Sequence, residues 1–289
     1  MVRPNAPQVQ VPTVRELFKP WGGGCWVHPG WEADFPWLLQ GTTGRLSGRT
    51  PTTWNFALFG ESPDPGARYH WESLGGILGF DTVDHSRQVH GNFIISPSMR
   101  TNSPGNRDDT GVTKPATLIL GPDADGHISG SEGVLLGVTI ADCVPVFLVD
   151  PETRVIGLLH AGWRGAVAGI LEEGIHRLRA EHAVDPGNLH VHFGPAICGK
   201  CFEVGPEVHL AMGMPDPGMP QPVDLRGHLA SRGVAAGLGP DRISQSAWCT
   251  LCGDSPFYSH RRGERGRQAG FLGIRAPGGP SQIPWEGEG

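Results

Sequence analysis

The chain has 289 residues, and its 23 basic and 29 acidic side chains give a formal net charge of −6. This charge excludes a polycation that coats nucleic acid or an anionic membrane. The 44 glycines and 27 prolines approach the composition of a disordered chain. Nine tryptophans and a hydrophobic share of 38%, however, provide material for a large core. We therefore expect one folded domain or two closely packed halves.

The predicted elements begin with a polar, proline-rich segment over residues 1–20, which we expect to be a flexible N-terminal arm. Residues 36–90 alternate short apolar runs with Gly, Pro and Asp, a pattern typical of strands and turns with one helix. Residues 95–115 are rich in Ser, Asn, Gly and Pro, which predicts a long surface loop. We expect a single catalytic domain over residues 21–275, followed by a flexible tail over 276–289.

Apolar, β-branched runs then predict a series of strands. They cover residues 133–140, 144–149, 154–160 and 189–193. Apolar side chains recur along one stripe between residues 163 and 182, so we expect an amphipathic helix there. Shorter helices are predicted over residues 205–213 and 224–237. The strands are too closely spaced for one doubly wound sheet, which favours a different arrangement within the α/β class.

The cellular compartment is predicted from two absences. The first residues contain no apolar run long enough for a signal-peptide core, and the apolar stretch 134–149 is too short and polar to span a membrane. Six cysteines without a secretion signal suggest a reducing cytoplasm, where thiols serve as metal ligands or nucleophiles. We expect a cytoplasmic monomer or homodimer with no membrane or nucleic-acid partner.

The segment HAGWRG at residues 160–165 joins a predicted strand to a predicted helix. Such a turn directs free backbone N–H groups toward whatever lies beside His160, and Arg164 adds a fork of donors. The arrangement suits an anion such as phosphate. The alternative is a tight turn whose glycines only allow close packing, and the turn alone does not decide between the two.

A second candidate group consists of His90 in QVHG, Cys143 in ADC and His160. Two imidazoles and a thiolate suit zinc, and three protein ligands with an open fourth position indicate a catalytic site. The carboxylate of Asp142 lies beside Cys143 at a strand junction, where an unpaired charge is costly. The alternatives are a small buried thiol and ordinary histidines, because no local metal template joins these residues.

Five segments, in this order, resemble the laccase-domain family, whose members were first called multicopper polyphenol oxidoreductases and later described as zinc-dependent purine nucleoside phosphorylases. The segments are QVHG (88–91), ADCVPV (141–146), HAGWRG (160–165), GPAICGKCFEVG (194–205) and SHRR (259–262). The similarity covers roughly residues 36–272. It implies a single-domain α/β/β/α sandwich of cysteine-hydrolase-like type, with His90, Cys143 and His160 as the zinc ligands.

The resemblance also implies substrates: adenosine, inosine, guanosine and methylthioadenosine for phosphorolysis, and adenosine for deamination at the same site. Deamination requires a metal-activated water and a carboxyl group that moves protons, for which Asp142 is the first candidate and Glu203 the second. Phosphorolysis requires a phosphate held in line with the sugar C1′, and Arg164 is the favoured ligand, with Arg261 and Arg262 as second choices. The predicted substrate-binding residues are Asn55, Gln88, Arg164 and Arg261.

The sequence departs from the family pattern at several positions. Phe202 stands where many members carry Tyr, and His260 replaces a Tyr of the SYRR segment. Near the start, either Arg45 or Arg49 takes the place of an expected arginine. These differences bear on substrate preference.

Two pairs of cysteines, Cys198 with Cys201 and Cys249 with Cys252, form a CxxC…CxxC arrangement. This pattern is a template for structural zinc. Because the pairs are further apart than in a zinc ribbon, we favour reduced thiols that pack near each other. A second, structural zinc and a redox pair are the alternatives.

Two further functions remain open. Cys143 could be the nucleophile of a Cys–His hydrolase or amidase, with His160 or His90 as its base. A copper polyphenol oxidase would need several copper ions. His190 and His192 form an HxH pair on a predicted strand, but the sequence offers no companion ligands of a multicopper centre. We therefore interpret the pair as part of a half-exposed strand face.

Overall fold

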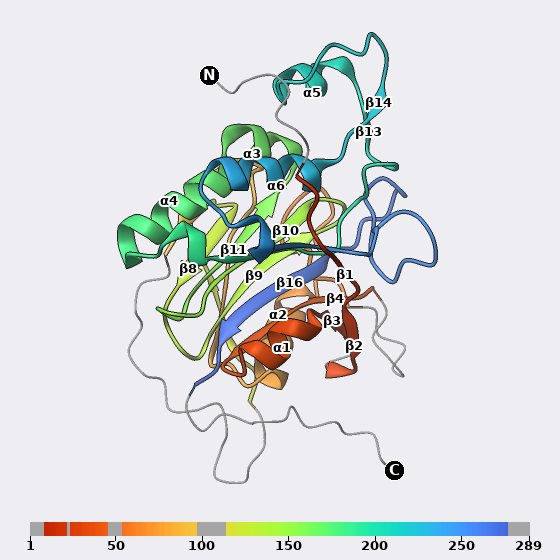
Figure 1. The fold of residues 1–289 in the computed structure, drawn as a ribbon. Helices are drawn as coiled ribbons and strands as arrows, with labels where there is room; N and C mark the ends of the chain where they lie inside the picture. The colour runs from red at the N-terminus through yellow and green to blue at the C-terminus, as the bar shows by residue number, and fades with distance from the viewer. Residues whose placement is uncertain (1–8, 22–23, 46–53, 97–113, 277–289) are drawn as a thin grey trace.

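The protein is described from a computed structural model for residues 9–21, 24–45, 54–96 and 114–276. Two large sheets face each other, and helices cover their outer faces (Figure 1). The first sheet contains, in spatial order, β1 (Thr13–Val14), β15 (Ile243–Ser246), β12 (His190–Phe193), β10 (Val144–Asp150), β11 (Val155–Ala161), β8 (Gly126–Ser129) and β6 (Ile94–Ile95). The second contains β2 (Leu17–Lys19), β3 (Cys25–Val27), β4 (Leu38–Thr43), β16 (Gln268–Ile274), β9 (Val134–Ile140), β5 (Thr82–His85) and β7 (Thr117–Leu120).

Helices complete an α/β/β/α sandwich within the described residues. The first sheet is covered by α3 (Trp163–Ala168), α4 (Ile170–His182) and α6 (Leu225–Ala235), and the second by α2 (Ala67–Ile77). The remaining helical segments are α1 (Pro29–Asp34), α5 (Pro206–Ala211) and the 3-10 turns Pro186–Asn188 and Pro240–Arg242. The strand pair β13 (Glu203–Val204) and β14 (Gln221–Pro222) projects with α5 from one end (Figure 1). The cysteine-hydrolase-like label rests on the resemblance alone and stays a prediction.

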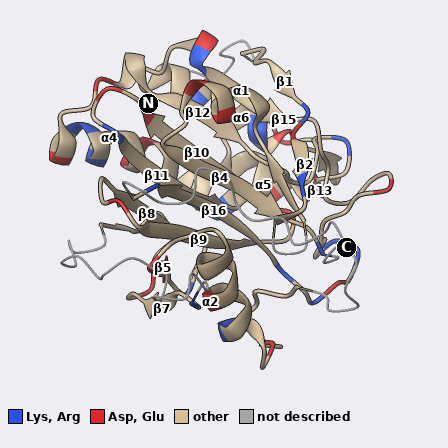
Figure 2. Cartoon of the chain, turned by 90° about the horizontal axis from the view of Figure 1, so that it is seen from below, with Lys and Arg blue, Asp and Glu red and all other residues tan. Residues whose placement is uncertain are grey.

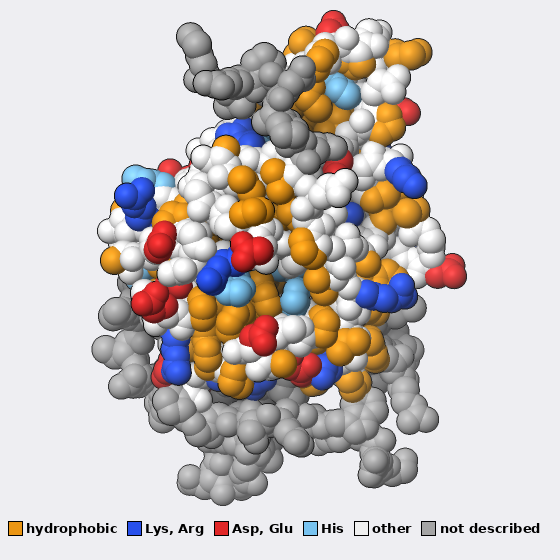
Figure 3. Space-filling view, in the orientation of Figure 1, with side chains coloured by type: hydrophobic (Ala, Val, Ile, Leu, Met, Phe, Trp, Pro, Cys, Tyr) orange, Lys and Arg blue, Asp and Glu red, His pale blue; other side chains and the backbone are white. Residues whose placement is uncertain are grey.

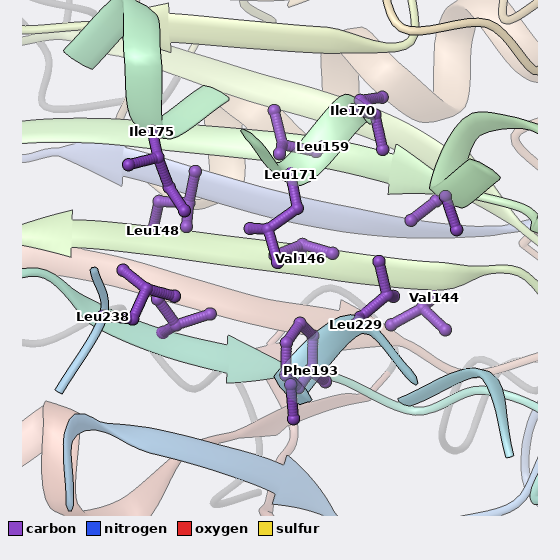
Figure 4. Close-up of a cluster of buried hydrophobic side chains, with 14 of the residues drawn as sticks. Val144, Val146, Leu148, Leu159, Ile170, Leu171, Ile175, Phe193, Leu229 and Leu238 are labelled. Carbon is purple, nitrogen blue, oxygen red and sulfur yellow. The ribbon is translucent and has the colours of Figure 1, made fainter. Parts of the chain in front are cut away.

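The central strands are buried on both faces, which explains their continuous apolar sequences. In β10, Val146 and Leu148 pack with Leu171 and Ile175 of α4 (Figure 4). Phe147, between them, points to the opposite face and packs against the second sheet. This alternation follows from the two-residue period of a strand, and it places one apolar layer under the helices and another between the sheets.

Charged residues lie mainly on outer helices and connecting segments (Figure 2). On the face shown in Figure 3, basic and acidic side chains are interspersed with apolar ones. No helix in the described ranges has the length and apolar character needed to cross a membrane.

The predicted strands 133–140, 144–149 and 154–160 correspond to β9, β10 and β11. The single helix predicted over residues 163–182 is instead two helices, because Gly169 has a φ of 85° that ends α3 and begins α4. Residues 13–19, which the sequence assigns to an N-terminal arm, pair with β15 and β3. Most of the predicted loop over 95–115, and the tail from 277, lie outside the described residues.

The prediction of a half-exposed HxH face is wrong for His192, which is 2% exposed. Its Nδ1 lies 2.9 Å from Ser244 Oγ, and its Nε2 lies 3.0 Å from Glu16 Oε1. Trp31 of α1 packs against the same ring. This face is buried because α1 and the N-terminal segment cover it.

Candidate metal centre and active site

The three predicted metal ligands meet at one end of the first sheet. His160 lies near the end of β11, Cys143 directly precedes β10, and the two strands are paired antiparallel at this point. His90 arrives from the connection between β5 and β6. The donor atoms of the three side chains lie within 4.8 Å of one another. His160 is buried, Cys143 half-buried and His90 exposed, so the group has one open side.

Asp125, which sequence analysis did not identify, holds this group together. It is fully buried, and its Oδ1 accepts hydrogen bonds from His160 Nδ1 and the backbone N–H of His90, both at 2.9 Å. Its Oδ2 accepts from the N–H groups of Val89 at 3.1 Å and Gly91 at 2.7 Å. One carboxylate therefore fixes the His90 segment and leaves His160 Nε2 available as a ligand.

The charges of the three groups depend on one another. Burial opposes ionisation of Asp125, but hydrogen bonds from His160 and the backbone hold the pKa of this carboxyl below its usual range. Burial disfavours the His160 imidazolium, yet the Cys143 thiolate and Asp125 raise its pKa to about 9. Burial likewise opposes the thiolate, but His160 and His90 lower the pKa of Cys143 to about 6. Without metal, the pair favours a thiolate and an imidazolium.

Two residues of the site have left-handed backbone conformations that side chains rarely adopt, His90 with φ 61° and Asp142 with φ 86°. Asp142 is held there by hydrogen bonds to both carboxylate oxygens. Thr250 Oγ1 donates at 2.5 Å and the backbone N–H of Arg261 donates at 2.7 Å. The turn places Cys143 at the start of β10, facing His160.

The glycines of HAGWRG are required for close approach. A Cβ at Gly162 would lie 3.0 Å from His90 Cδ2 and 3.1 Å from Cys143 Sγ. A Cβ at Gly165 would lie 2.8 Å from the backbone oxygen of Gly91. The turn therefore packs the QVHG segment against the other two ligands.

We expect Gly162→Ala to displace both neighbouring ligands and to weaken metal binding about 10- to 100-fold. Competition with a chromogenic chelator measures the change. Gly130→Ala is the matched control, because its Cβ would meet only Val155 Cγ2 at 3.4 Å. Unchanged metal affinity in Gly162→Ala would show that the ligands do not depend on this contact.

A cavity of about 810 Å³ opens over the three ligands, within the size range of small-molecule sites. The predicted residues Gln88, Asp142, Arg164 and Arg261 also line it. Arg164 is exposed and stacks on Trp163 at 4.3 Å. The cavity thus combines a metal-ligand cluster with cationic side chains.

Two predicted substrate-binding residues, Gln88 and Asn55, form hydrogen bonds that hold neighbouring segments of the chain in place. The side-chain amide of Gln88 is paired with Thr139, from which its Oε1 accepts the backbone N–H at 2.7 Å and the hydroxyl at 2.8 Å. The side chain of Asn55 is absent from the cavity lining. Its Nδ2 donates to Asp64, and its Oδ1 accepts from the N–H groups of Ala57 and Arg267. Asn55 therefore fixes the backbone of Arg267, which does line the cavity.

Glu203 and Arg262 also differ in placement from their predicted roles. Glu203 is exposed on β13 and does not line the cavity, and its backbone oxygen accepts a hydrogen bond from Arg261. Arg262 donates to the carbonyls of Thr250 and Leu251 and pairs with Glu264. Its guanidinium thus organises the loop behind the cavity. Arg45 also pairs with Glu264, while Arg49 lies outside the described residues.

Sequence reasoning missed Asp125, Thr250 and Arg267. Asp125 lies in PDADGH, where Asp and Gly are expected for turn formation, so its composition hides its role. Thr250 lies between Cys249 and Leu251, and nothing local indicates that it reaches Asp142.

The four remaining predicted ligands form a second cluster. The Sγ atoms of Cys198, Cys201, Cys249 and Cys252 lie within 4.8 Å of one another. Burial and the neighbouring thiols raise the pKa of Cys201, and Cys249 and burial raise the pKa of Cys252. Burial also opposes ionisation of Cys249, but backbone N–H donors lower the pKa of its thiol to about 7. The cluster contains donors that could hold a metal ion, and three backbone N–H groups point at Cys249 Sγ. The interpretation as reduced thiols that pack near each other stays a prediction.

A family model described as "Multi-copper polyphenol oxidoreductase laccase" matches residues 68–275. The chain belongs to this family. The resemblance found in the sequence is thereby confirmed.

Similar proteins include "Purine nucleoside phosphorylase YlmD" of Geobacillus stearothermophilus, which is 33% identical over 65% of this chain and 70% of its own length. "Adenosine deaminase RL5" from an unknown prokaryotic organism is 34% identical over 48% of this chain and 56% of its own. The crystal structure of YlmD from Geobacillus stearothermophilus has a TM-score of 0.73 at 26% identity, covering 90% of this chain and 100% of that one.

Proposed function

We propose that this protein is a zinc-dependent purine nucleoside phosphorylase for adenosine, inosine, guanosine and methylthioadenosine, with adenosine deaminase activity at the same site. The observation that carries the proposal is the cluster of His90, Cys143 and His160, backed by Asp125, in a cavity that also presents Arg164. The names of the relatives support the same pair of activities.

The donor set fits zinc. Two imidazole nitrogens and one thiolate are ligands that zinc accepts, and a fourth position facing the cavity is typical of a catalytic site. The carboxylate of Asp125 accepts a hydrogen bond from Nδ1 of His160, and a carboxylate is a usual partner of a metal-bound imidazole. When bound, zinc supplies Lewis-acid activation of water for deamination. A multicopper oxidase would need further ligand groups, and the described part of the chain contains only this cluster and the four cysteines.

Arg164 is our candidate for binding phosphate. Its guanidinium stacks on Trp163 and makes no ion pair among the described residues, so its donors are available to an oxyanion. Arg261 has a lesser capacity, because it donates to the backbone oxygen of Glu203 and stacks on Phe202. Bidentate arginine contacts orient an anion as well as bind it, which in-line attack at C1′ requires.

Asp142 is our candidate for proton transfer, because its carboxylate lines the cavity beside Cys143. The hydrogen bonds from Thr250 and Arg261 fix both oxygens in place. Glu203 is exposed outside the cavity lining, so we assign it no catalytic role.

Arg164→Ala is expected to raise the KM for phosphate about 10- to 100-fold, the cost of losing a charge-assisted hydrogen-bonded contact. Deamination of adenosine uses no phosphate and should change little. Steady-state assays of both reactions on one preparation measure the split, with Arg68→Ala on α2 as the control. An equal loss of both activities would assign Arg164 a structural role instead.

The proposed function is tested by metal analysis together with adenosine turnover in the presence and absence of phosphate. Adenine and ribose 1-phosphate, formed only with phosphate, together with inosine formed without it, are the expected products. Turnover of none of the four nucleosides in a zinc-loaded preparation would overturn the proposal.

A Cys–His hydrolase is the second candidate, because Cys143, His160 and Asp125 follow one another as nucleophile, base and orienting carboxylate would. Zinc bound at Cys143 would block the nucleophile. The hydrolase is therefore favoured only if purified protein lacks zinc and iodoacetamide rapidly modifies Cys143.

A further inference from the structure

Two Cys-x-x-Cys turns meet beside the active-site cavity. Cys198 and Cys201 follow β12, while Cys249 and Cys252 follow β15. Cys198 Sγ and Cys252 Sγ are 4.0 Å apart, and all four cysteines are free thiols. A tetrahedron of four sulfur atoms around zinc, at bond lengths of about 2.3 Å, has edges of about 3.8 Å. The Cys198–Cys252 distance is close to that edge, and all four sulfur atoms lie within 4.8 Å of one another.

Backbone donors surround one of these sulfur atoms. Cys249 Sγ accepts hydrogen bonds from the N–H groups of Cys198 at 3.2 Å, Leu251 at 3.4 Å and Cys252 at 3.5 Å. The first turn is closed by the N–H groups of Cys201 and Phe202, which donate to the oxygen of Cys198. The N–H donors at Cys249 Sγ stabilise the thiolate, which is the form of cysteine that binds metal.

Burial does not explain the cluster. Cys249 is buried, but Cys252 is exposed and Cys198 and Cys201 are only half-buried, so three of the four thiols do not serve as core side chains. The buried guanidinium of Arg226 in α6 donates to the backbone oxygens of Ser246 and Trp248, in the segment leading to Cys249. A cation in this position offsets part of the net double negative charge of a zinc tetrathiolate.

Both turns continue directly into walls of the active site. Ile197 and Phe202, on either side of the first pair, line the cavity. Thr250, beside Cys249, donates to Asp142 and is bonded through its own N–H to the backbone oxygen of Ala196 at 3.1 Å. A link between the two turns therefore fixes the position of Asp142 relative to the wall that contains Phe202.

We propose that Cys198, Cys201, Cys249 and Cys252 bind one structural zinc ion, which clamps these two turns together and thereby holds Asp142 and Phe202 in the geometry of the active site. The ion is separate from the one at His90, Cys143 and His160. Its binding does not depend on which reaction the cavity catalyses.

Metal content by inductively coupled plasma mass spectrometry tests the proposal. We expect two zinc ions per chain in the wild-type protein and in the Cys25→Ala control, and one in Cys143→Ala. Cobalt reconstituted into Cys143→Ala should show the intense charge-transfer absorption of four thiolate ligands. The double variant Cys201→Ser/Cys252→Ser should bind one zinc ion fewer than the wild-type protein. When the same two substitutions are added to Cys143→Ala, the cobalt-loaded protein should no longer show the four-thiolate absorption.

The KM for adenosine tests whether the structural zinc holds the cavity wall in position. The Cys201→Ser/Cys252→Ser variant should retain the zinc at Cys143 while its KM for adenosine rises several-fold. A metal-free Cys143→Ala protein that is folded by circular dichroism would overturn the proposal. So would a Cys198–Cys252 disulfide found by mass spectrometry in protein purified under reducing conditions. Absence of nucleoside turnover would refute the proposed function but leave the zinc count of Cys143→Ala unaffected.

Discussion

Replacing Cys143 with alanine is expected to abolish binding of the catalytic zinc and to lower phosphorolysis and deamination of adenosine together, each by more than about 100-fold. Cys143 is the central donor of the cluster, since it contacts both His160 and His90. Its loss removes a metal ligand and deprives the exposed imidazole of His90 of its hydrogen-bonded thiol. Product analysis by liquid chromatography and metal analysis on one preparation measure both effects.

The control for this variant is Cys25→Ala, because Cys25 is buried in β3 and belongs to neither cysteine-containing ligand cluster. It should retain both activities and its metal. If Cys143→Ala lost its zinc and kept full phosphorolysis, the two reactions would not share a metal-dependent site. Loss of deamination alone would restrict zinc to that reaction.

Asp125→Asn is expected to weaken zinc binding about 10- to 100-fold, although Asp125 touches no metal. An amide nitrogen cannot accept hydrogen bonds, so at least one set of N–H donors around this residue loses its acceptor. The uncharged side chain also orients His160 less firmly. Because the residue is fully buried, the free energy of unfolding should fall by about 1–3 kcal/mol as well.

Chelator competition and thermal denaturation in excess chelator separate these two effects. Asp123→Asn is the matched control, since Asp123 precedes Asp125 by two residues but is exposed and pairs with Arg87. It should change neither quantity appreciably. An Asp125→Asn protein with wild-type zinc affinity would mean that His160 is oriented by packing alone.

Much of the fold was predictable where one residue pattern had one structural solution. The apolar runs that became β9, β10 and β11 are buried on both faces, and their length leaves little alternative to strands. The break at Gly169 was not predictable from periodicity, because the apolar stripe continues across it. Burial of His192 depends on contact with Glu16, which lies far away in the sequence.

The same distinction applies to the site. The resemblance identified His90, Cys143 and His160 as a group, and the fold brings them together. The function of Asp125 could not be read from its neighbours, because its four partners come from two other segments. Whether a polar side chain faces substrate or supports its neighbours is decided by tertiary contacts, as Asn55 and Arg262 illustrate.

The place of β16 in the second sheet has a consequence for biosynthesis. This strand is the last along the described chain, yet it lies between β4 and β9 and pairs with both. During translation, β4 and β9 must wait with unpaired edges until Ile274 has left the ribosome. Unpaired edges bind other strands readily, so chains interrupted before this point should aggregate or recruit chaperones. Completion of the second sheet is thus a late event, and the first sheet has all its strands well before it.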